Sequence, residues 1–179
     1  MTRDELEHAI RAACDVADET EVYVFGSQAV LGQFPDAPPS LRQSAEADVF
    51  PKNKPERVAD IDAMLGELSQ FHRTHGFYVH GVSLETAILP GDWENRAIKV
   101  QNLNTRDCIG WCLEVRDLAA SKLAAFRDKD RDFVRTLLLE GMITSGALLR
   151  RLRQLPRSRE ERERLVTWVR RTEKELSGG

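Results

Sequence analysis

The hydrophobic pattern of the chain changes near residue 116, and this change constrains the fold more than any other feature. Before it, short segments rich in β-branched and aromatic residues alternate with helical patterns and with turns marked by Gly and Pro. From Asp117 onward, apolar residues recur at helical spacing. The pattern predicts an α+β fold, with a small mixed-sheet core at residues 1–116 and a C-terminal helical region at residues 117–179.

The same patterns predict the individual elements. We expect strands at residues 21–25, 45–50, 77–82, 97–100 and 108–115. We expect helices at residues 3–16 and 57–71, a further helix start in QAVLGQF, and helices at 117–141, 144–154 and 159–176. The Pro-rich segment PDAPPSLRQS is expected to be a loop.

Composition excludes several classes of protein. With 41% hydrophobic and 31% charged residues, the chain is neither collagen-like nor broadly disordered. It contains no long apolar run and no signal-like N-terminus, so we expect a cytoplasmic protein without a membrane partner. Three cysteines suit a reducing compartment. A zinc site with Cys108 and Cys112, completed by His72, His75 or His80, is disfavoured because no tight Cys pair is present.

Charge is unevenly distributed along the chain. The segment from Gly146 to Gly179 holds ten basic residues and five glutamates, a net charge of +5, which leaves −8 on the remainder. A basic segment on an acidic body is typical of polyanion binding. Because acidic and basic residues are mixed within it, a solvated terminal helix is an equally good interpretation.

A predicted strand ends at Gly26-Ser27, where a helical pattern begins at once. Glycine lets a ligand approach the backbone, and Ser27 is expected to cap the helix. A helix N-terminus offers free N–H groups and positive potential to a phosphate. An ordinary structural turn remains the alternative, because Gly-Ser turns before helices are common.

Glu46 and Asp48 lie two residues apart on the second predicted strand. This spacing puts both carboxylates on one face, about 7 Å apart at the backbone, where they can converge on a cation. Hard oxygen ligands favour Mg²⁺ or Mn²⁺. The pair therefore predicts a metal platform, with a solvated edge strand as the alternative.

Three pieces together resemble one superfamily: VYVFGSQAVLGQF, SAEADVFP and DLAASKLAAFRDKDRDFV. They resemble the AbiEii-like and MenT-type toxin nucleotidyltransferases of the minimal, DNA polymerase beta-like superfamily. The resemblance covers residues 22–138, and Ser44 stands two residues before the acids, as a Ser or Thr does in the toxin branch. Glu46 departs from the commoner Asp of that pattern.

The resemblance implies a fold, an activity and site residues. Gly26, Ser27 and Ser44 would bind the nucleotide, Glu46 and Asp48 would hold two metal ions, and Lys122 and Asp130 would match the catalytic lysine and aspartate of the third segment. The implied reaction transfers NMP from an NTP, preferably a pyrimidine nucleotide, to the 3′ end of tRNA and so blocks translation. A cognate antitoxin protein is the implied partner.

Further candidates follow from the residues and, for Glu85, from the resemblance, since the superfamily often draws a third acid from a later strand. Lys122 and Asp130 interrupt an apolar helical stripe, so each needs a partner or a ligand; on one helix they would lie about 12 Å apart, which disfavours direct pairing. Arg96 and Arg127 are candidate contacts for the triphosphate. Glu85 is a candidate third metal carboxylate, although a loop position favours a solvated role. His80 is interpreted as a core histidine, and Asp117 as the cap of the helix that carries Lys122.

Three other functions stay open at this point. The acidic body is compatible with a nucleotidyltransferase that modifies a small molecule such as an antibiotic. A protein acceptor is also compatible, because no motif identifies the acceptor surface. The Glu46 departure points to a third alternative, a catalytically degenerate binding module with the same fold.

Overall fold

The computed structural model describes residues 1–178, which form two compact units. Unit 1 consists of residues 1–86 and 96–114 and contains the β-sheet. Unit 2 consists of residues 87–95 and the chain from Val115 onward, and it is helical. The expected α+β class, with a mixed-sheet core and C-terminal helices, is confirmed.

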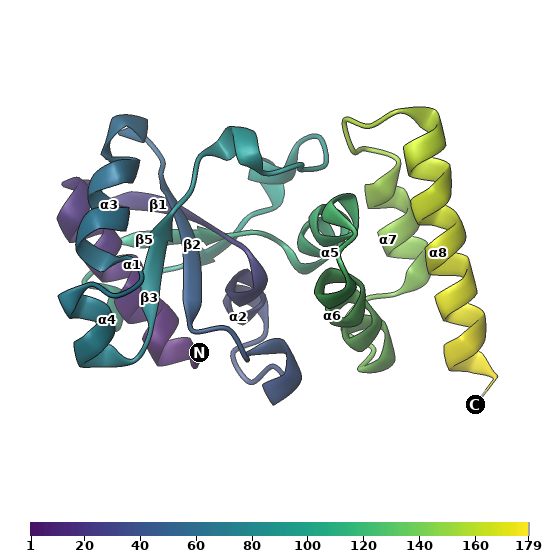
Figure 1. Cartoon of the computed structure of the whole chain (residues 1–179), viewed down its shortest axis with the longest axis horizontal. Coiled ribbons are helices and arrows are strands. Elements are labelled where there is room, and N and C mark those ends of the chain that lie inside the picture. The colour runs from purple at the N-terminus through teal and green to yellow at the C-terminus, as the bar shows by residue number, and fades with distance from the viewer. Residues whose placement is uncertain (179) are drawn as a thin grey trace. The chain divides into compact units, whose positions relative to one another are not determined.

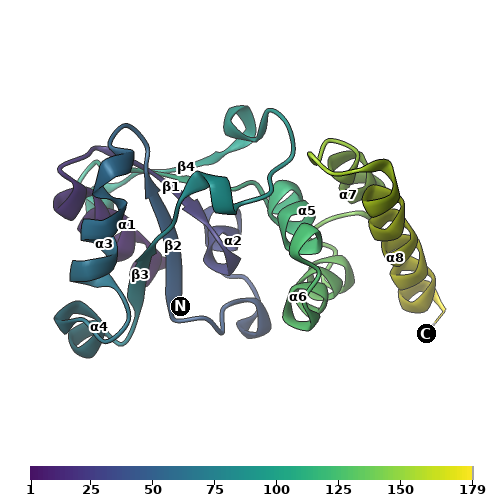
Figure 2. The ribbon, with the colours of Figure 1, turned by 45° about the horizontal axis from the view of Figure 1, so that its top comes forward.

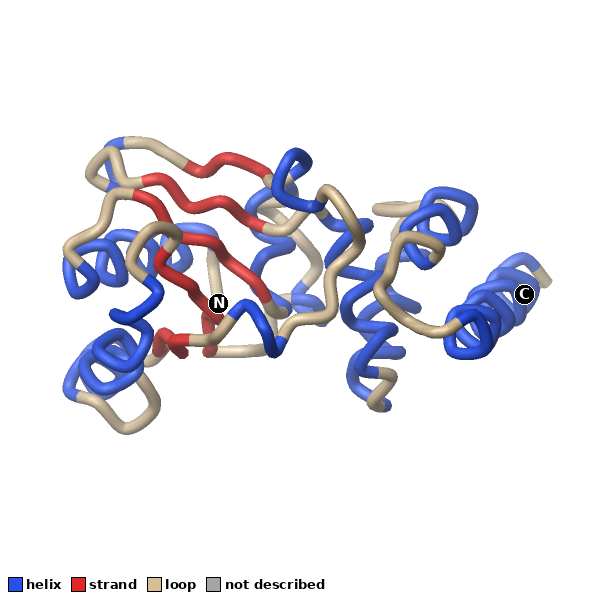
Figure 3. The backbone as a smooth tube through the Cα atoms, turned by 90° about the horizontal axis from the view of Figure 1, so that it is seen from above, coloured by secondary structure: helices blue, strands red, loops and turns tan. Residues whose placement is uncertain are grey.

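Unit 1 is built on a five-stranded sheet, drawn in red in Figure 3, with strand order β3-β2-β1-β5-β4. β1 pairs parallel with β5 and antiparallel with β2, while β2 and β3 are parallel neighbours. The antiparallel pair β4–β5 completes the sheet on the other side. The strands are β1 (Glu21–Phe25), β2 (Glu46–Pro51), β3 (Tyr78–Gly81), β4 (Ile98–Val100) and β5 (Ile109–Cys112).

One face of this sheet is apolar and carries the helices of unit 1. This face includes Val22, Val24, Ala47 and Val49, which are all fully buried, while the residues between them along β1 and β2 point to the opposite face. The helices are α1 (Arg3–Ala17), α2 (Val30–Gln33), α3 (Val58–Leu65) and α4 (Gln70–His75). α1 contacts β1 and β2 and lies beside α3 (Figure 1). The opposite face carries Glu46 and Asp48 together with the buried aromatic residues Tyr23, Phe25 and Phe50.

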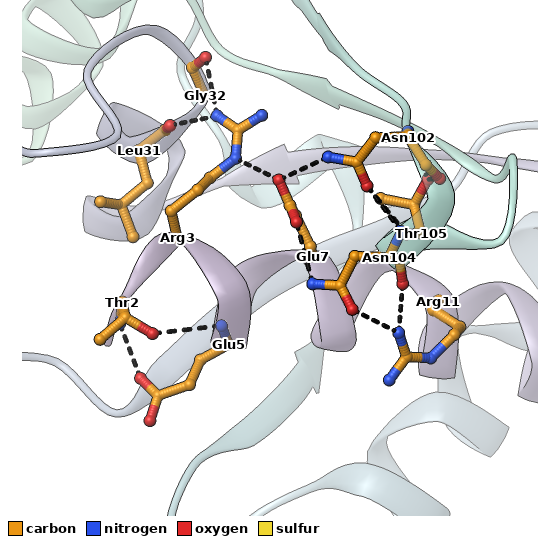
Figure 4. Close-up of polar contacts among 10 residues, drawn as sticks. All are labelled: Thr2, Arg3, Glu5, Glu7, Arg11, Leu31, Gly32, Asn102, Asn104 and Thr105. Carbon is orange, nitrogen blue, oxygen red and sulfur yellow. Dashed lines mark hydrogen bonds and ion pairs between the residues drawn. The ribbon is translucent and has the colours of Figure 1, made fainter.

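α1 begins with a capping box in which Thr2 and Glu5 satisfy each other's backbone N–H groups. Figure 4 shows how the helix is fastened to its neighbours. Nε of Arg3 donates to Oε1 of Glu7 at 2.8 Å, and the same guanidinium donates to the Leu31 carbonyl of α2. Glu7 also accepts hydrogen bonds from two loop asparagines, Asn102 and Asn104. Arg3 thus ties α1 to α2, and the buried Glu7 carboxylate ties α1 to the loop before β5.

The helix expected at residues 57–71 is divided into α3 and α4, so that prediction is wrong in its extent. Gly66 ends α3, and its N–H donates to the Asp62 carbonyl at 2.9 Å. Leu68 then adopts a left-handed backbone, with φ at 65°, and Ser69 caps α4 through the His72 N–H. A glycine stop followed by a serine N-cap interrupts the apolar periodicity that predicted one helix.

Unit 2 contains α5 (Val115–Ala125), α6 (Asp128–Leu139), α7 (Ser145–Leu152) and α8 (Arg159–Ser177). The single helix expected from Asp117 to Gly141 is wrong, because Phe126 takes a left-handed backbone with φ at 55° and separates α5 from α6. The two halves fold back against each other, and α8 packs against α7 (Figure 2). In the described part of the chain, every helix is too short or too polar to cross a bilayer.

Candidate metal and nucleotide site

Glu46, Asp48 and His80 converge on one face of the sheet in unit 1. β2 and β3 are parallel, and their register makes His80 the direct neighbour of Asp48. Nδ1 of His80 lies 3.1 Å from Oε1 of Glu46 and 3.4 Å from Oδ1 of Asp48. Each side chain offers one potential ligand atom, and these atoms all lie within 4.8 Å of one another.

The two carboxylates lie as the sequence predicts. Glu46 and Asp48 share a face of β2, and their side chains are 34% and 26% exposed, so water and a ligand can reach them. The edge-strand alternative is wrong, because β2 lies between β1 and β3. Two partly buried acids on an interior strand repel each other unless a positive charge lies between them.

Gly26 makes room for one of these acids. Its backbone has φ at +63°, and a Cβ atom built there would lie 1.9 Å from Oδ2 of Asp48. Phe25 is the register partner of Asp48, so the end of β1 brings this glycine directly against the carboxylate. The glycine is needed here for the close approach of Asp48, whereas the sequence suggests the approach of a ligand to the backbone.

The turn after β1 differs from its expected form. Gly26 occupies the N-cap position and Ser27 is the first residue of a 3₁₀ turn, Ser27–Ala29, so Ser27 is not the helix cap. The α-helix that follows, α2, has only four residues, and its dipole is correspondingly weak. Gln28 is fully buried, and within residues 1–178 neither its Oε1 nor its Nε2 atom has a hydrogen-bond partner.

Ser44 acts on Glu46 through the backbone. Its Oγ accepts a hydrogen bond from the Glu46 N–H at 3.1 Å, which fixes the turn where β2 begins. The structure therefore places Ser44 beside the acids. It assigns the hydroxyl a contact that orients the first of them.

His80 is the site residue that sequence reasoning missed. Its interpretation as a core histidine is wrong, because its side chain is 46% exposed and faces the two acids. The signal was present in the alternation Tyr78-Val79-His80, which repeats Glu46-Ala47-Asp48 with an apolar residue between two polar ones. Glu85 is exposed in a 3₁₀ turn, Leu84–Thr86, and among the described residues it lies outside the cluster.

The zinc alternative does not match the geometry of the cysteines. Cys112 is fully buried in β5. It packs so closely against Gly32 that a Cβ atom added to Gly32 would lie 2.4 Å from the Cβ atom of Cys112. Burial raises the pKa of its thiol to about 12, so the thiolate that zinc needs is disfavoured. Cys108 instead interacts with Cys14, whose pKa is raised by burial and by that neighbour.

The electrostatic potential around Glu46, Asp48 and His80 is negative, because several acidic side chains lie near them. The pKa of Tyr78 is raised by burial and by the charges of Glu46, Glu67 and Asp48. A fourth acid, Asp62 of α3, places Oδ1 3.8 Å from Nε2 of His80. Two carboxylates and an imidazole whose ligand atoms lie within 4.8 Å of one another are a donor set that fits a divalent cation.

Three predicted residues meet within unit 2. Nζ of Lys122 lies 3.5 Å from Oδ1 of Asp130, although the one-helix expectation disfavoured such pairing; the break at Phe126 brings them together. Arg127 donates to Asp130 through Nε at 2.6 Å and Nη2 at 3.3 Å. The Asp130 side chain is fully buried, whereas that of Lys122 is 14% exposed. The Asp130 carboxylate therefore holds the charged side chains of Lys122 and Arg127 in place.

The two remaining candidates lie elsewhere in the chain. Asp117 lies inside the first turn of α5, so it does not occupy the N-cap position, and it forms a buried ion pair with Arg151 at 2.7 Å. Arg96 is half-buried at the end of a 3₁₀ turn, Trp93–Arg96.

Comparison with known proteins adds the family. No curated protein and no solved structure shows significant similarity to the chain. One family model matches residues 4–174, nearly the whole chain, and is described as a nucleotidyltransferase of unknown function (DUF6036). It supports the class that the resemblance implies, without the toxin type. The chain thus belongs to this family of nucleotidyltransferases of unknown function.

Proposed function

We propose that the chain is a metal-dependent nucleotidyltransferase that transfers NMP from an NTP to an acceptor hydroxyl and releases pyrophosphate. The observation that supports this most is the convergence of Glu46 and Asp48 on one face of the sheet, with the Asp48 carboxylate packed directly against Gly26. Membership of a nucleotidyltransferase family supports the same reaction class. A degenerate binding module is disfavoured, because Glu46 and Asp48 keep both charges on one face.

We assign the residues of unit 1 separate roles in binding the metal ion and the triphosphate. Glu46 and Asp48 would hold the divalent ion, Mg²⁺ or Mn²⁺, and Ser44 keeps Glu46 in register through its backbone. When bound, such an ion supplies positive charge for the phosphates and lowers the pKa of the acceptor hydroxyl. The backbone at Gly26 and Ser27 would receive the triphosphate, and the reaction needs no covalent nucleophile.

In unit 2, the resemblance gives Lys122 a phosphate-binding role. A lysine suits it because positive charge is most useful where negative charge builds up on the transferred group. Asp130 is fully buried and bonded to both Lys122 and Arg127. We therefore assign Asp130 the positioning of these cations. Arg96 and Arg127 remain candidate triphosphate contacts.

As acceptor we propose the 3′ end of tRNA, with a pyrimidine NTP as donor and a protein antitoxin as partner. The resemblance supports this choice, and so does the charge of the C-terminal helices. Four arginines, Arg153, Arg159, Arg162 and Arg170, line one groove along α8 together with a single acid, Glu163. Phosphodiester backbones bind to such surfaces by releasing counterions.

A labelling experiment tests the proposal. Purified protein is incubated with Mg²⁺ or Mn²⁺, each labelled NTP in turn and total tRNA. We expect label on the tRNA 3′ end with a pyrimidine NTP, and none with Asp48→Asn. Label on an aminoglycoside or on a protein would identify that molecule, in place of tRNA, as the acceptor. No transfer by well-folded protein to any acceptor would overturn the enzymatic proposal.

A further inference from the structure

We propose that His80 is a direct ligand of the metal ion, so that the site is a mixed carboxylate–imidazole centre that prefers Mn²⁺ to Mg²⁺. This inference rests on the metal site of the proposed function and adds its third donor and its selectivity. It departs from the all-carboxylate set expected from the sequence, in which Glu85 was the third candidate.

The distances suit ligands of a single ion. Adjacent donors of an octahedral ion with bonds of about 2.1 Å lie about 3.0 Å apart. Nδ1 of His80 lies 3.1 Å from Oε1 of Glu46 and 3.4 Å from Oδ1 of Asp48. Nδ1 is therefore spaced from each carboxylate oxygen as neighbouring ligands are, and all three atoms lie within 4.8 Å of one another.

The backbone fixes this arrangement. Asp48 and His80 are register partners on parallel strands, and Glu46 lies two residues before Asp48 on the same face. Donors on paired strands keep their spacing better than donors on loops. Glu85, in contrast, belongs to an exposed 3₁₀ turn.

The second ring nitrogen of His80 also has a partner of the right kind. Nε2 lies 3.8 Å from Oδ1 of Asp62, which projects from α3. Histidines that bind metals through one nitrogen commonly direct the other N–H at a carboxylate, which fixes the tautomer and makes the ligand more basic. Asp62 lies beyond hydrogen-bonding distance of the ring here, but it is near enough to serve as an outer positioning residue once its side chain turns toward Nε2.

The donor set determines the selectivity. Mg²⁺ prefers oxygen ligands and water, whereas imidazole suits first-row transition metals. The alternative is that His80 is a protonated counter-charge to the two acids and leaves the site when an ion binds. These two roles predict opposite effects of removing the ring: loss of affinity for a ligand, little change or a gain for a counter-charge.

Direct metal binding distinguishes the two roles without any measurement of transfer. The full chain is titrated with Mn²⁺ and, separately, with Mg²⁺ by calorimetry, and Mn²⁺-bound protein is measured by pulsed electron paramagnetic resonance for coupling to nitrogen. We expect Mn²⁺ to bind at least about tenfold tighter than Mg²⁺, with a ¹⁴N coupling from one imidazole.

Four variants complete the experiment. His80→Ala should lose the ¹⁴N coupling and weaken Mn²⁺ binding by at least about tenfold, while Asp62→Asn keeps the coupling and weakens binding by about tenfold. His80→Asp should restore binding with the preference moved toward Mg²⁺. His75→Ala, at an exposed histidine of α4, is the matched control and should match wild type.

The outcomes separate this inference from the proposed function. Absence of ¹⁴N coupling in wild-type protein, or unchanged Mn²⁺ affinity in His80→Ala, overturns the ligand role even when nucleotide transfer is robust. Nitrogen-coupled Mn²⁺ in a protein that transfers no nucleotide supports the ligand role and counts against the proposed function alone.

Discussion

The carboxylate of Asp48 occupies the space that a side chain at position 26 would need. A Cβ atom on Gly26 would lie 1.9 Å from Oδ2 of Asp48 and 2.9 Å from its Cγ. Because Gly26 has no side chain, the end of β1 and the Asp48 side chain of β2 lie closer together than any other residue at position 26 would allow. The position of the Asp48 carboxylate in the site therefore depends on the absence of a side chain at position 26.

Gly26→Ala should disrupt both folding and the site. The backbone at Gly26 has φ at 63° and ψ at −170°, a region that only glycine adopts freely. We expect the free energy of unfolding to fall by about 1–3 kcal/mol from backbone strain alone, and the clash with Asp48 to add to this loss. Urea unfolding and labelled-NTP transfer measure the two effects.

A double-mutant cycle isolates the contact between the two residues. Combining Gly26→Ala with Asp48→Ala should cost less than the sum of the single changes, because the second removes the atoms that the new methyl group meets. Gly76→Ala is the control, since Gly76 has φ at +77° but no atom within 4 Å of an added Cβ. Strict additivity in the cycle would contradict the contact.

Asp48→Asn should separate activity from stability. Metal-assisted transfer is expected to fall by about 10³-fold or more, because several kcal/mol of charge stabilisation depend on the bound ion. The removal of one of two neighbouring negative charges should leave the urea midpoint equal to or above that of wild type when divalent ions are absent. A lower midpoint with retained transfer would show that Asp48 is structural.

Gln28→Met should stabilise the chain. Gln28 is fully buried, and its amide lacks a hydrogen-bond partner among residues 1–178. Methionine has a similar shape without the polar atoms, so the free energy of unfolding should rise by about 1–2 kcal/mol. Thermal unfolding of the two proteins tests this, and an equal or lower midpoint would mean that the amide is satisfied in solution.

Lys122→Met and Asp130→Asn should behave differently, although the two residues touch. Asp130 keeps its two hydrogen bonds from Arg127 when Lys122 is replaced, so we expect a loss below about 1.5 kcal/mol together with weaker NTP use. Asp130→Asn removes the fully buried carboxylate that faces both Lys122 and Arg127 and should cost about 3 kcal/mol. Urea unfolding and the KM for NTP distinguish the two; equal destabilisation by both variants would contradict the positioning role.

Acid should loosen α1 through Glu7. Burial opposes its ionisation, but hydrogen bonds from Arg3, Asn104 and Asn102 outweigh this and hold its pKa below the ordinary value of 4.5. A lowered pKa in the folded state means that the stabilisation is complete above pH 4.5 and is lost as pH falls through the folded value. Glu7→Gln should therefore flatten the decline in stability below that pH, as urea titrations at successive pH values would show.

Local patterns were sufficient to predict much of unit 1. β1 spans the expected residues, because EVYVF combines β-branched and aromatic residues and ends at a glycine. The acids of β2 share a face as their spacing requires. Helical continuity was overestimated in two places. Gly66 and Ser69 compete with the periodicity around them, whereas the left-handed backbone of Phe126 has no sequence signal, since aromatic residues rarely adopt it.

Contacts between distant segments limited the prediction of the site. His80 faces Asp48 only because β2 and β3 are adjacent and parallel, and no local pattern reveals that pairing. The close approach of Gly26 to Asp48 depends equally on the register between β1 and β2. The partner of Asp130 was likewise hidden by the expectation of one straight helix.

The parallel pairing of β2 and β3 has a consequence for assembly. The chain must cross over through α3 and α4 before His80 can reach the acids, so closure of a long loop precedes completion of the cluster. An ion that binds all three side chains then favours the closed chain over every partly formed one. Binding of a divalent ion at this cluster would thus raise the free energy of unfolding with increasing metal concentration.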